Sequence, residues 1–179
     1  MEKILAAPFA KIKVKPVASA LIGSLFLALM SQVSVPLPFT PVPMTMQTFG
    51  VLCLAITLGG RGAAFAVLAY LLEGSLGLPV FAKNVPGLWF MGPTAGYLIG
   101  FVAAAYVLGS YLETARSSFA AFCAMFGAEL LILALGSAWL AIFLGPEMAF
   151  NLGAMPFVAM SVLKAGLATI TRKAWNTIP

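Results

Sequence analysis

Three charged side chains lie within otherwise apolar stretches of this chain, namely Glu73, Glu129 and Lys164. A charge inside a bilayer is costly, so such residues often serve binding or transport and have a partner. We interpret Lys164 as a ligand contact, with an internal ion pair to Glu129 as the alternative. Glu129 is interpreted as structural. Glu73 lies near the outer end of its apolar run, so it either accepts hydrogen bonds from ligand N–H groups or stays solvated at the interface.

The neighbours of Lys164 strengthen its candidacy. Phe157, Ser161, Lys164 and Ala168 fall on one helical face, because residues three and four apart are neighbours on a helix. The sequence therefore predicts an ammonium with a hydroxyl one turn away. This pair suits a ligand carboxylate or carbonyl.

A second candidate surface follows Gly92 and Pro93. This dipeptide is typical of a helix start, where the missing N–H of proline costs little. Thr94, Tyr97 and Phe101 then share one face of the predicted helix. Its free N–H groups can bind an anion or a carbonyl. Simple packing of the helix end is the alternative.

The segment at 35–49 reads VPLPFTPVPMTMQTF and is predicted to be non-helical. Its four prolines fix φ and remove backbone donors. Such backbone does not cross lipid, so it lies at the membrane surface or lines a cavity. Because it also carries Phe39, Thr45 and Gln47, we expect a stiff amphipathic lid over a small ligand.

Composition indicates the class of protein that must position these residues. The 179-residue chain is 62% hydrophobic and 8% charged, with a mean hydropathy of +1.06. Soluble domains are about 45–50% apolar and roughly 25% charged, so an integral membrane protein is predicted. Six apolar runs are each a candidate for one spanning helix: Val17–Val33, Met44–Leu58, Ala63–Gly77, Pro93–Leu112, Ser118–Leu144 and Phe150–Thr171.

We therefore predict an all-α bundle of six transmembrane helices forming a single integral membrane domain over residues 1–179. Residues 1–16 form a cytoplasmic tail, 34–45 an outer Pro-rich lid loop, and 78–92 a second outer loop. Both termini are predicted to be cytoplasmic, because that orientation puts most basic residues inside. The inside set is Lys3, Lys11, Lys13, Lys15, Arg61, Arg116, Arg172 and Lys173, and Lys83 alone lies outside.

Several function classes lack the residues they need. The chain has no His, and Cys53 and Cys123 lack metal-site spacing, so neither a metal nor a cofactor is expected. A P-loop for ATP hydrolysis is absent, as are the H-E-x-x-H and G-x-S-x-G motifs of hydrolases. The positive charge is distributed as an orientation signal, which argues against nucleic acid. The residues favour a membrane binding protein that contacts lipid and has no energy source of its own.

Small residues recur at helical spacing along the first apolar run, at Ala20, Ser24 and Ala28. Such a stripe lets another helix approach closely. Its partner is either a helix of the same chain or a second membrane subunit.

Three long motifs resemble those of the BioY family of biotin transporters. They are V-P-L-P-F-T-P-V-P-M-T-M-Q-T-F-G at 35–50, Y-L-L-E-G-S-L-G-L-P-V-F-A at 70–82 and G-P-T-A-G-Y-L-I-G-F at 92–101. Their order and spacing match, and the resemblance spans nearly the whole chain.

The resemblance implies the substrate-binding S component of an energy-coupling factor transporter in the cell membrane. Such a subunit captures biotin from outside, and its partners are an energy-coupling transmembrane subunit and two ABC-type ATPases. The stripe on the first helix would be its docking surface. Asn84 and Glu73 would hold the ureido ring of biotin, and Phe39, Thr45 and Gln47 would belong to the lid and pocket wall. Tyr97 would form an aromatic wall beside Thr94.

One motif of the resemblance differs in this chain. Where the last helix of most members carries P-G-D-x-x-K, residues 159–164 read A-M-S-V-L-K. The lysine matches as Lys164, but Ser161 replaces the aspartate, and an uncharged acceptor makes weaker hydrogen bonds. Either Glu73 or Glu129 compensates, or the ligand is a different vitamin. A carrier without ATPases is a further alternative, which co-purification with ATPase subunits would distinguish.

Overall fold

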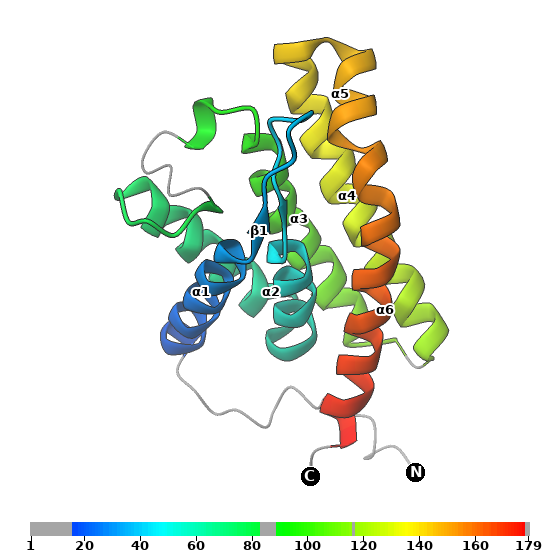
Figure 1. The fold of residues 1–179 in the computed structure, drawn as a ribbon. Coiled ribbons are helices and arrows are strands. Elements are labelled where there is room, and N and C mark those ends of the chain that lie inside the picture. Colours follow the sequence, from blue (N-terminus) through cyan, green and yellow to red (C-terminus); the bar gives the residue numbers. More distant parts are fainter. Residues whose placement is uncertain (1–15, 83–88, 116, 178–179) are drawn as a thin grey trace.

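The computed structural model describes residues 16–82, 89–115 and 117–177 (Figure 1). Within them the fold is almost entirely helical, as predicted. The elements are α1 (Pro16–Gln32), β1 (Ser34–Val35), β2 (Met44–Thr45), α2 (Gln47–Ser75), η3 (Trp89–Met91), α3 (Ala95–Leu112), α4 (Ser118–Leu144), α5 (Pro146–Gly153) and α6 (Met155–Thr177). The predicted tail, apart from Pro16, lies outside the described residues, and so does Asn84.

Four helical stretches in the described chain are long and apolar enough to cross a membrane. They are Gln47–Ser75, Ala95–Leu112, Ser118–Leu144 and Pro146–Thr177. α1 is also apolar but has 17 residues, or roughly 25 Å at the rise of an α-helix. The protein is thus a multi-pass membrane protein, because several helices meet the length that a bilayer requires.

α2 holds most of the second and the third predicted apolar runs, since Met44 and Thr45 belong to β2 and the helix ends at Ser75, and it is broken at Gly59. This residue has φ 68° and ψ −177°, a conformation open essentially only to glycine. The two arms, residues 47–58 and 60–75, lie side by side, because the Gln47 amide bonds the Tyr70 hydroxyl across them. The predicted tight turn is therefore a reversal centred on one glycine.

The helices pack in an order that encloses the α2 arms. α2 contacts α1, α3 and α6, while α3 contacts α4, and α4 contacts α5 and α6. Figure 1 shows α4 and α6 side by side along one edge of the molecule, with α1 at the opposite edge. The most buried positions accordingly fall on the inner helices, as for Leu52, Ala66 and Leu108.

One end of the bundle gathers the turns that were predicted to be cytoplasmic. Arg172 Nη2 donates to the main-chain oxygen of Ala115 at 2.7 Å, and the Gly60 N–H donates to Glu113 Oε1 at 3.4 Å. The α2 reversal, the α3–α4 connection and the end of α6 therefore lie together. Of the basic residues used to predict the orientation, Lys3, Lys11, Lys13, Lys15, Lys83 and Arg116 lie outside the described residues.

The proline-containing segment forms a hairpin at the opposite end of the molecule. Ser34 pairs with Thr45 and Val35 with Met44 in an antiparallel ladder. Residues 36–43 between the strands contain no helix, as the prolines predict. The strands themselves were not predicted, because they are two residues long and depend on the ends of α1 and α2 meeting. We call residues 34–45 the Pro-rich hairpin.

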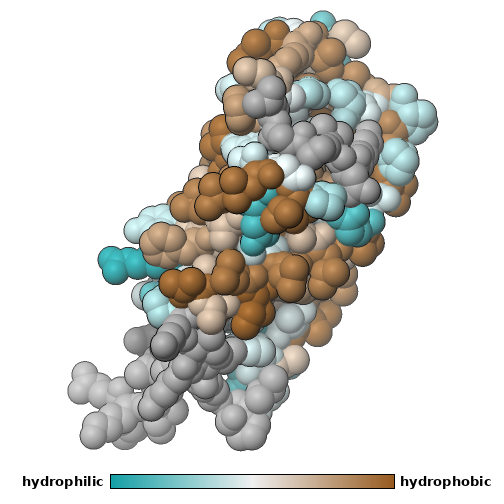
Figure 2. Space-filling model, turned by 90° about the vertical axis from the view of Figure 1, so that its left-hand side faces the viewer, coloured by the Kyte–Doolittle hydropathy of each residue, from teal (hydrophilic) through white to brown (hydrophobic). Residues whose placement is uncertain are grey.

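α1 presents an apolar face away from the bundle. Its outward side chains are Val17, Leu21, Ile22, Leu25 and Leu29, each more than half exposed. Figure 2 shows hydrophobic residues across the middle of the molecular face that contains this helix. A surface of this kind suits lipid or another membrane helix.

The stripe of small residues on α1 faces partly inward. Ser24 is fully buried, and its hydroxyl donates to Glu73 Oε1 on α2 at 2.6 Å. Ala20 and Ala28 are half-buried. At Ser24 the stripe thus packs within the chain, which is one of the two alternatives the sequence leaves open. Docking of Ala20 and Ala28 against a partner stays a prediction.

Candidate ligand-binding site

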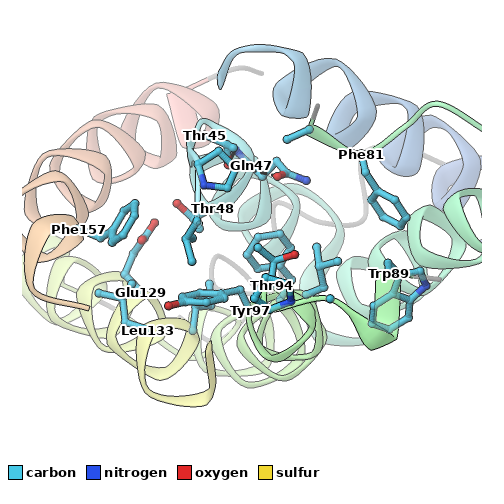
Figure 3. A pocket seen from close by; sticks show the side chains of 18 of the residues that line it. Thr45, Gln47, Thr48, Phe81, Trp89, Thr94, Tyr97, Glu129, Leu133 and Phe157 are labelled. Atoms are coloured by element: carbon cyan, nitrogen blue, oxygen red, sulfur yellow. Dashed lines mark hydrogen bonds between the residues drawn. The ribbon is translucent and has the colours of Figure 1, made fainter. Parts of the chain in front are cut away.

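A cavity of about 260 Å³ lies between the Pro-rich hairpin and the inner helices. Its lining comes from the hairpin, α2, α3, α4 and α6, together with Phe81, Ala82 and Trp89 after α2 (Figure 3). Sites for drug-sized ligands typically measure about 300–1,000 Å³, so this cavity suits a smaller molecule. Its lining is mainly apolar, with polar side chains gathered where α6 meets the start of α2.

Lys164 ties α6 to the base of the Pro-rich hairpin. Its Nζ donates to the main-chain oxygen of Thr45 and to Thr48 Oγ1, both at 2.7 Å. The side chain is only 6% exposed. An ammonium has three donors, so two hydrogen bonds leave one N–H for another acceptor in the cavity.

Ser161 and Glu129 form the second polar pair of the lining. Ser161 Oγ lies 3.1 Å from Glu129 Oε2 and 3.1 Å from the main-chain oxygen of Phe157. Its single proton is thus shared between two acceptors. The predicted alternative of an ion pair between Lys164 and Glu129 is not formed, because Lys164 donates to the two threonines instead.

Glu129 is an incompletely satisfied buried carboxyl group. It is 2% exposed, and its Oε1 has no hydrogen-bond partner in the described chain. In Figure 3 its side chain extends from α4 into the cavity, between Phe157 and Thr48. Leaving a buried acceptor unpaired costs about 1–3 kcal/mol, and more when the group is charged.

Gln47 anchors the other side of the polar region. Its Nε2 donates to Tyr70 Oη at 2.6 Å, and its Oε1 accepts from Thr45 Oγ1 at 3.2 Å. Tyr70 Oη in turn donates to the main-chain oxygen of Val80 at 3.2 Å. This chain of bonds fixes the amide of Gln47, which is 5% exposed, at the cavity surface.

Aromatic rings supply much of the apolar wall. Tyr97 donates its hydroxyl proton to the main-chain oxygen of Gly153 at 2.8 Å, so its ring is held in place. On the other side of the cavity Phe81 packs against Tyr70 at 5.2 Å between ring centroids and against Trp89 at 6.5 Å, both edge-to-face (Figure 3). Rings so fixed offer flat surfaces for a ligand at little entropic cost.

Six of the predicted site residues line the cavity: Thr45, Gln47, Thr94, Tyr97, Ser161 and Lys164. Phe101 also lines the cavity, so the whole face proposed for the helix after Gly92 does. Phe157 lines it too, but Ala168, the fourth residue of the face on the last helix, is buried and is not among the lining residues. Whether these side chains contact a ligand stays a prediction.

Three predicted site residues are not among those that line the cavity. Phe39 is 53% exposed near the tip of the Pro-rich hairpin. Glu73 accepts the hydroxyl of Ser24, because its side chain points from α2 toward α1. Asn84 lies outside the described residues.

Other lining residues were missed or given a different role. Glu129 was interpreted as structural, yet it lines the cavity. Thr48, Tyr70, Phe81 and Trp89 were not proposed as site residues. Thr48 carries a hydroxyl in the same proline-containing segment as Thr45, which is the local signal that would have indicated it. The three rings are brought together only by the fold.

Comparison with known proteins agrees with this geometry. The model of the BioY family matches residues 4–179. The chain belongs to the BioY family. This confirms the resemblance inferred from the three motifs.

Relatives cover most of the chain. A probable biotin transporter BioY of Pyrococcus horikoshii is 37% identical over 151 residues, which is 82% of this chain and 89% of that protein. The biotin transporter BioY of Rhizobium etli is 37% identical over 172 residues, covering 88% and 90%. Biotin transporter BioY2 of Lactococcus lactis is 34% identical, covering 83% of each chain. These members are transporters, in agreement with the prediction of a transport protein rather than an enzyme.

The fold also has a counterpart among solved structures. The S-component for biotin from an ECF-type ABC transporter, solved at 2.1 Å, superposes with a TM-score of 0.83. The match covers 93% of each chain at 21% identity. The two proteins therefore share the same fold.

Proposed function

We propose that this BioY-family chain is the biotin-binding S component of an energy-coupling factor transporter. The observation that carries the proposal is the division of the cavity into an aromatic, apolar wall and one polar region. Biotin also combines polar and apolar parts. Its ureido ring offers two N–H donors and a carbonyl, its thiophane ring and the methylenes of its side chain are apolar, and the side chain ends in a carboxylate. Its relatives' names as biotin transporters support the same ligand.

Within this proposal each lining group has a role. Lys164, with Ser161, contacts the carboxylate or the ureido carbonyl through its third N–H. Gln47, Thr45 and Thr94 supply further hydrogen bonds, and Tyr97 packs its ring against the bicycle.

Two further residues come from the motifs alone. Phe39 on the Pro-rich hairpin covers the bound ligand. Asn84 approaches the ureido ring from the segment after α2.

The arrangement in the membrane follows from helix lengths and charge. We count six spans by treating the two arms of α2 separately and by joining α5 to α6. Both termini then lie in the cytoplasm, and the cavity opens outward.

Partners and location follow from the same proposal. An S component that lacks a P-loop depends on an energy-coupling transmembrane subunit and two ABC-type ATPases. The complex would reside in the cell membrane, which in a bacterium with two membranes is the inner one.

Calorimetric titration of the detergent-purified, biotin-free protein tests the function. Biotin and desthiobiotin, which share the ureido ring, are expected to bind tightly with one site each, and thiamine is expected to give no heat. A folded, ligand-free protein that gives no heat with biotin but binds another vitamin would refute the assignment of biotin.

A further inference from the structure

We propose that Glu129 is the residue that recognises the ureido N–H groups of the ligand. This inference rests on the proposed function, because it names the group of the same cavity that selects a cyclic urea. Glu129 lies on α4, on the opposite side of the lining from Gln47 and Thr45 (Figure 3). A ligand N–H would supply the hydrogen bond that this carboxyl group lacks.

The hydrogen bonds of the Glu129 carboxyl group are incomplete. Oε2 accepts the Ser161 hydroxyl at 3.1 Å, but Oε1 has no partner in the described residues. The side chain is 2% exposed and lines the cavity. Buried polar atoms in native structures almost always have a partner, so an unpaired oxygen on a side chain that lines the cavity leaves an acceptor for a donor from the ligand.

A second unpaired buried atom of the described chain lies away from the cavity lining. Ser137 Oγ on α4 is also without a partner in the described chain. It lies near Gly153, and it is not among the residues that line the cavity. Among the described residues, Glu129 is the one that combines an unpaired buried oxygen with a place in the cavity lining.

Ser161 and Lys164 beside Glu129 complement a cyclic urea. Ser161 and Lys164 are one turn apart on α6, and Ser161 bonds Glu129. A carboxyl group and an amino group therefore face the same polar region of the cavity. A cyclic urea places N–H groups next to a carbonyl, so the carboxylate can accept from an N–H while the ammonium donates to the carbonyl. A charged acceptor makes the stronger bond.

No other acidic side chain of the described residues lines the cavity. Glu73 is engaged by Ser24, Glu113 lies at the far end of the bundle beside Gly60, and Glu147 is exposed on α5. Among the described residues that line the cavity, Glu129 alone carries a carboxyl group.

The test compares two ligands on two proteins. The variant is Glu129→Gln, which keeps the shape of the side chain and removes its charge. The ligands are biotin and its cyclic carbonate analogue, in which oxygen replaces both ring N–H groups. Glu147→Gln is the matched control, since it removes the same charge from an exposed position. Calorimetry gives the dissociation constants, and size-exclusion chromatography reports folding.

Glu129→Gln is expected to weaken biotin binding at least about tenfold, as loss of a charged hydrogen bond implies. The preference for biotin over the carbonate is expected to shrink by a similar factor, because the N–H groups lose their charged acceptor. Glu147→Gln is expected to leave both values unchanged. If Glu129→Gln does not fold, Glu129→Asp replaces it. That variant keeps the carboxyl group but withdraws it by one methylene. It is expected to weaken biotin binding and to reduce the preference for biotin over the carbonate as well.

Two results would overturn the inference while the proposed function stands. One is a folded Glu129→Gln variant that binds biotin as tightly as the unaltered protein. The other is an equal loss for biotin and carbonate, which would mean that Glu129 only supports Ser161. Absence of biotin binding by the unaltered protein would instead remove the proposed function, and this inference with it.

Discussion

Substituting Lys164 by methionine separates its contact with a ligand from its contacts within the chain. The ammonium makes two intrachain hydrogen bonds, each 2.7 Å long, and is 6% exposed. A hydrogen bond to a charged group contributes about 1.5–3 kcal/mol, so the two together contribute up to about 3–6 kcal/mol before the cost of burying the charge is subtracted. Loss of this pair is expected to lower the melting temperature of the ligand-free protein.

The ligand contact is measured separately, through the biotin dissociation constant. Loss of one charged hydrogen bond to biotin, about 1.5–3 kcal/mol, corresponds to roughly 10- to 150-fold weaker binding. Calorimetry of Lys164→Met, with Lys173→Met on the exposed end of α6 as control, measures this value. The stabilisation of the protein by saturating biotin should fall in parallel.

A variant that melts earlier but binds biotin with unchanged affinity would refute the reasoning. It would mean that Lys164 serves only to join α6 to the Pro-rich hairpin. The third N–H would then play no part in recognition.

Two further substitutions test how the aromatic wall is held. In Gly136→Ala, the new Cβ overlaps the ring of Tyr97, so biotin affinity is expected to fall about tenfold, whereas Gly127→Ala on the same helix meets no neighbouring atom and should bind normally in the same calorimetric assay. Unchanged binding in Gly136→Ala would show that the Tyr97 ring does not form the ligand wall. In Tyr70→Phe, the amide of Gln47 loses its buried partner, which is expected to destabilise the protein by about 1–3 kcal/mol. Thermal unfolding in detergent measures this loss, and an unchanged melting temperature would contradict the role of that bond.

Much of the site could be predicted from local sequence. Proline chemistry dictates a non-helical hairpin at 36–43, because φ is fixed and donors are missing. Helical spacing alone places Ser161 beside Lys164, and Thr94 beside Tyr97, because neighbours along a helix face are set by its period. The membrane class follows from composition, and the family from motifs whose length leaves little room for chance.

The role of Glu129 could not be predicted in the same way. In a soluble helix a polar face marks the side away from the core. α4 is apolar nearly all around, because its outer side meets lipid rather than water. Its sequence therefore carries no periodic signal that tells which face is inward.

The same reason explains why the position of the Glu73 side chain was not predicted. Both glutamates interrupt apolar helices, but one points toward α1 and the other into the cavity. Composition and spacing determined that this chain is a membrane-embedded binding protein with a cation on its last helix. Only the tertiary structure decided which glutamate lines the cavity beside Lys164. In lipid, the rotation of each helix about its axis is set by packing against neighbouring helices and not by the distribution of polar residues in its own sequence.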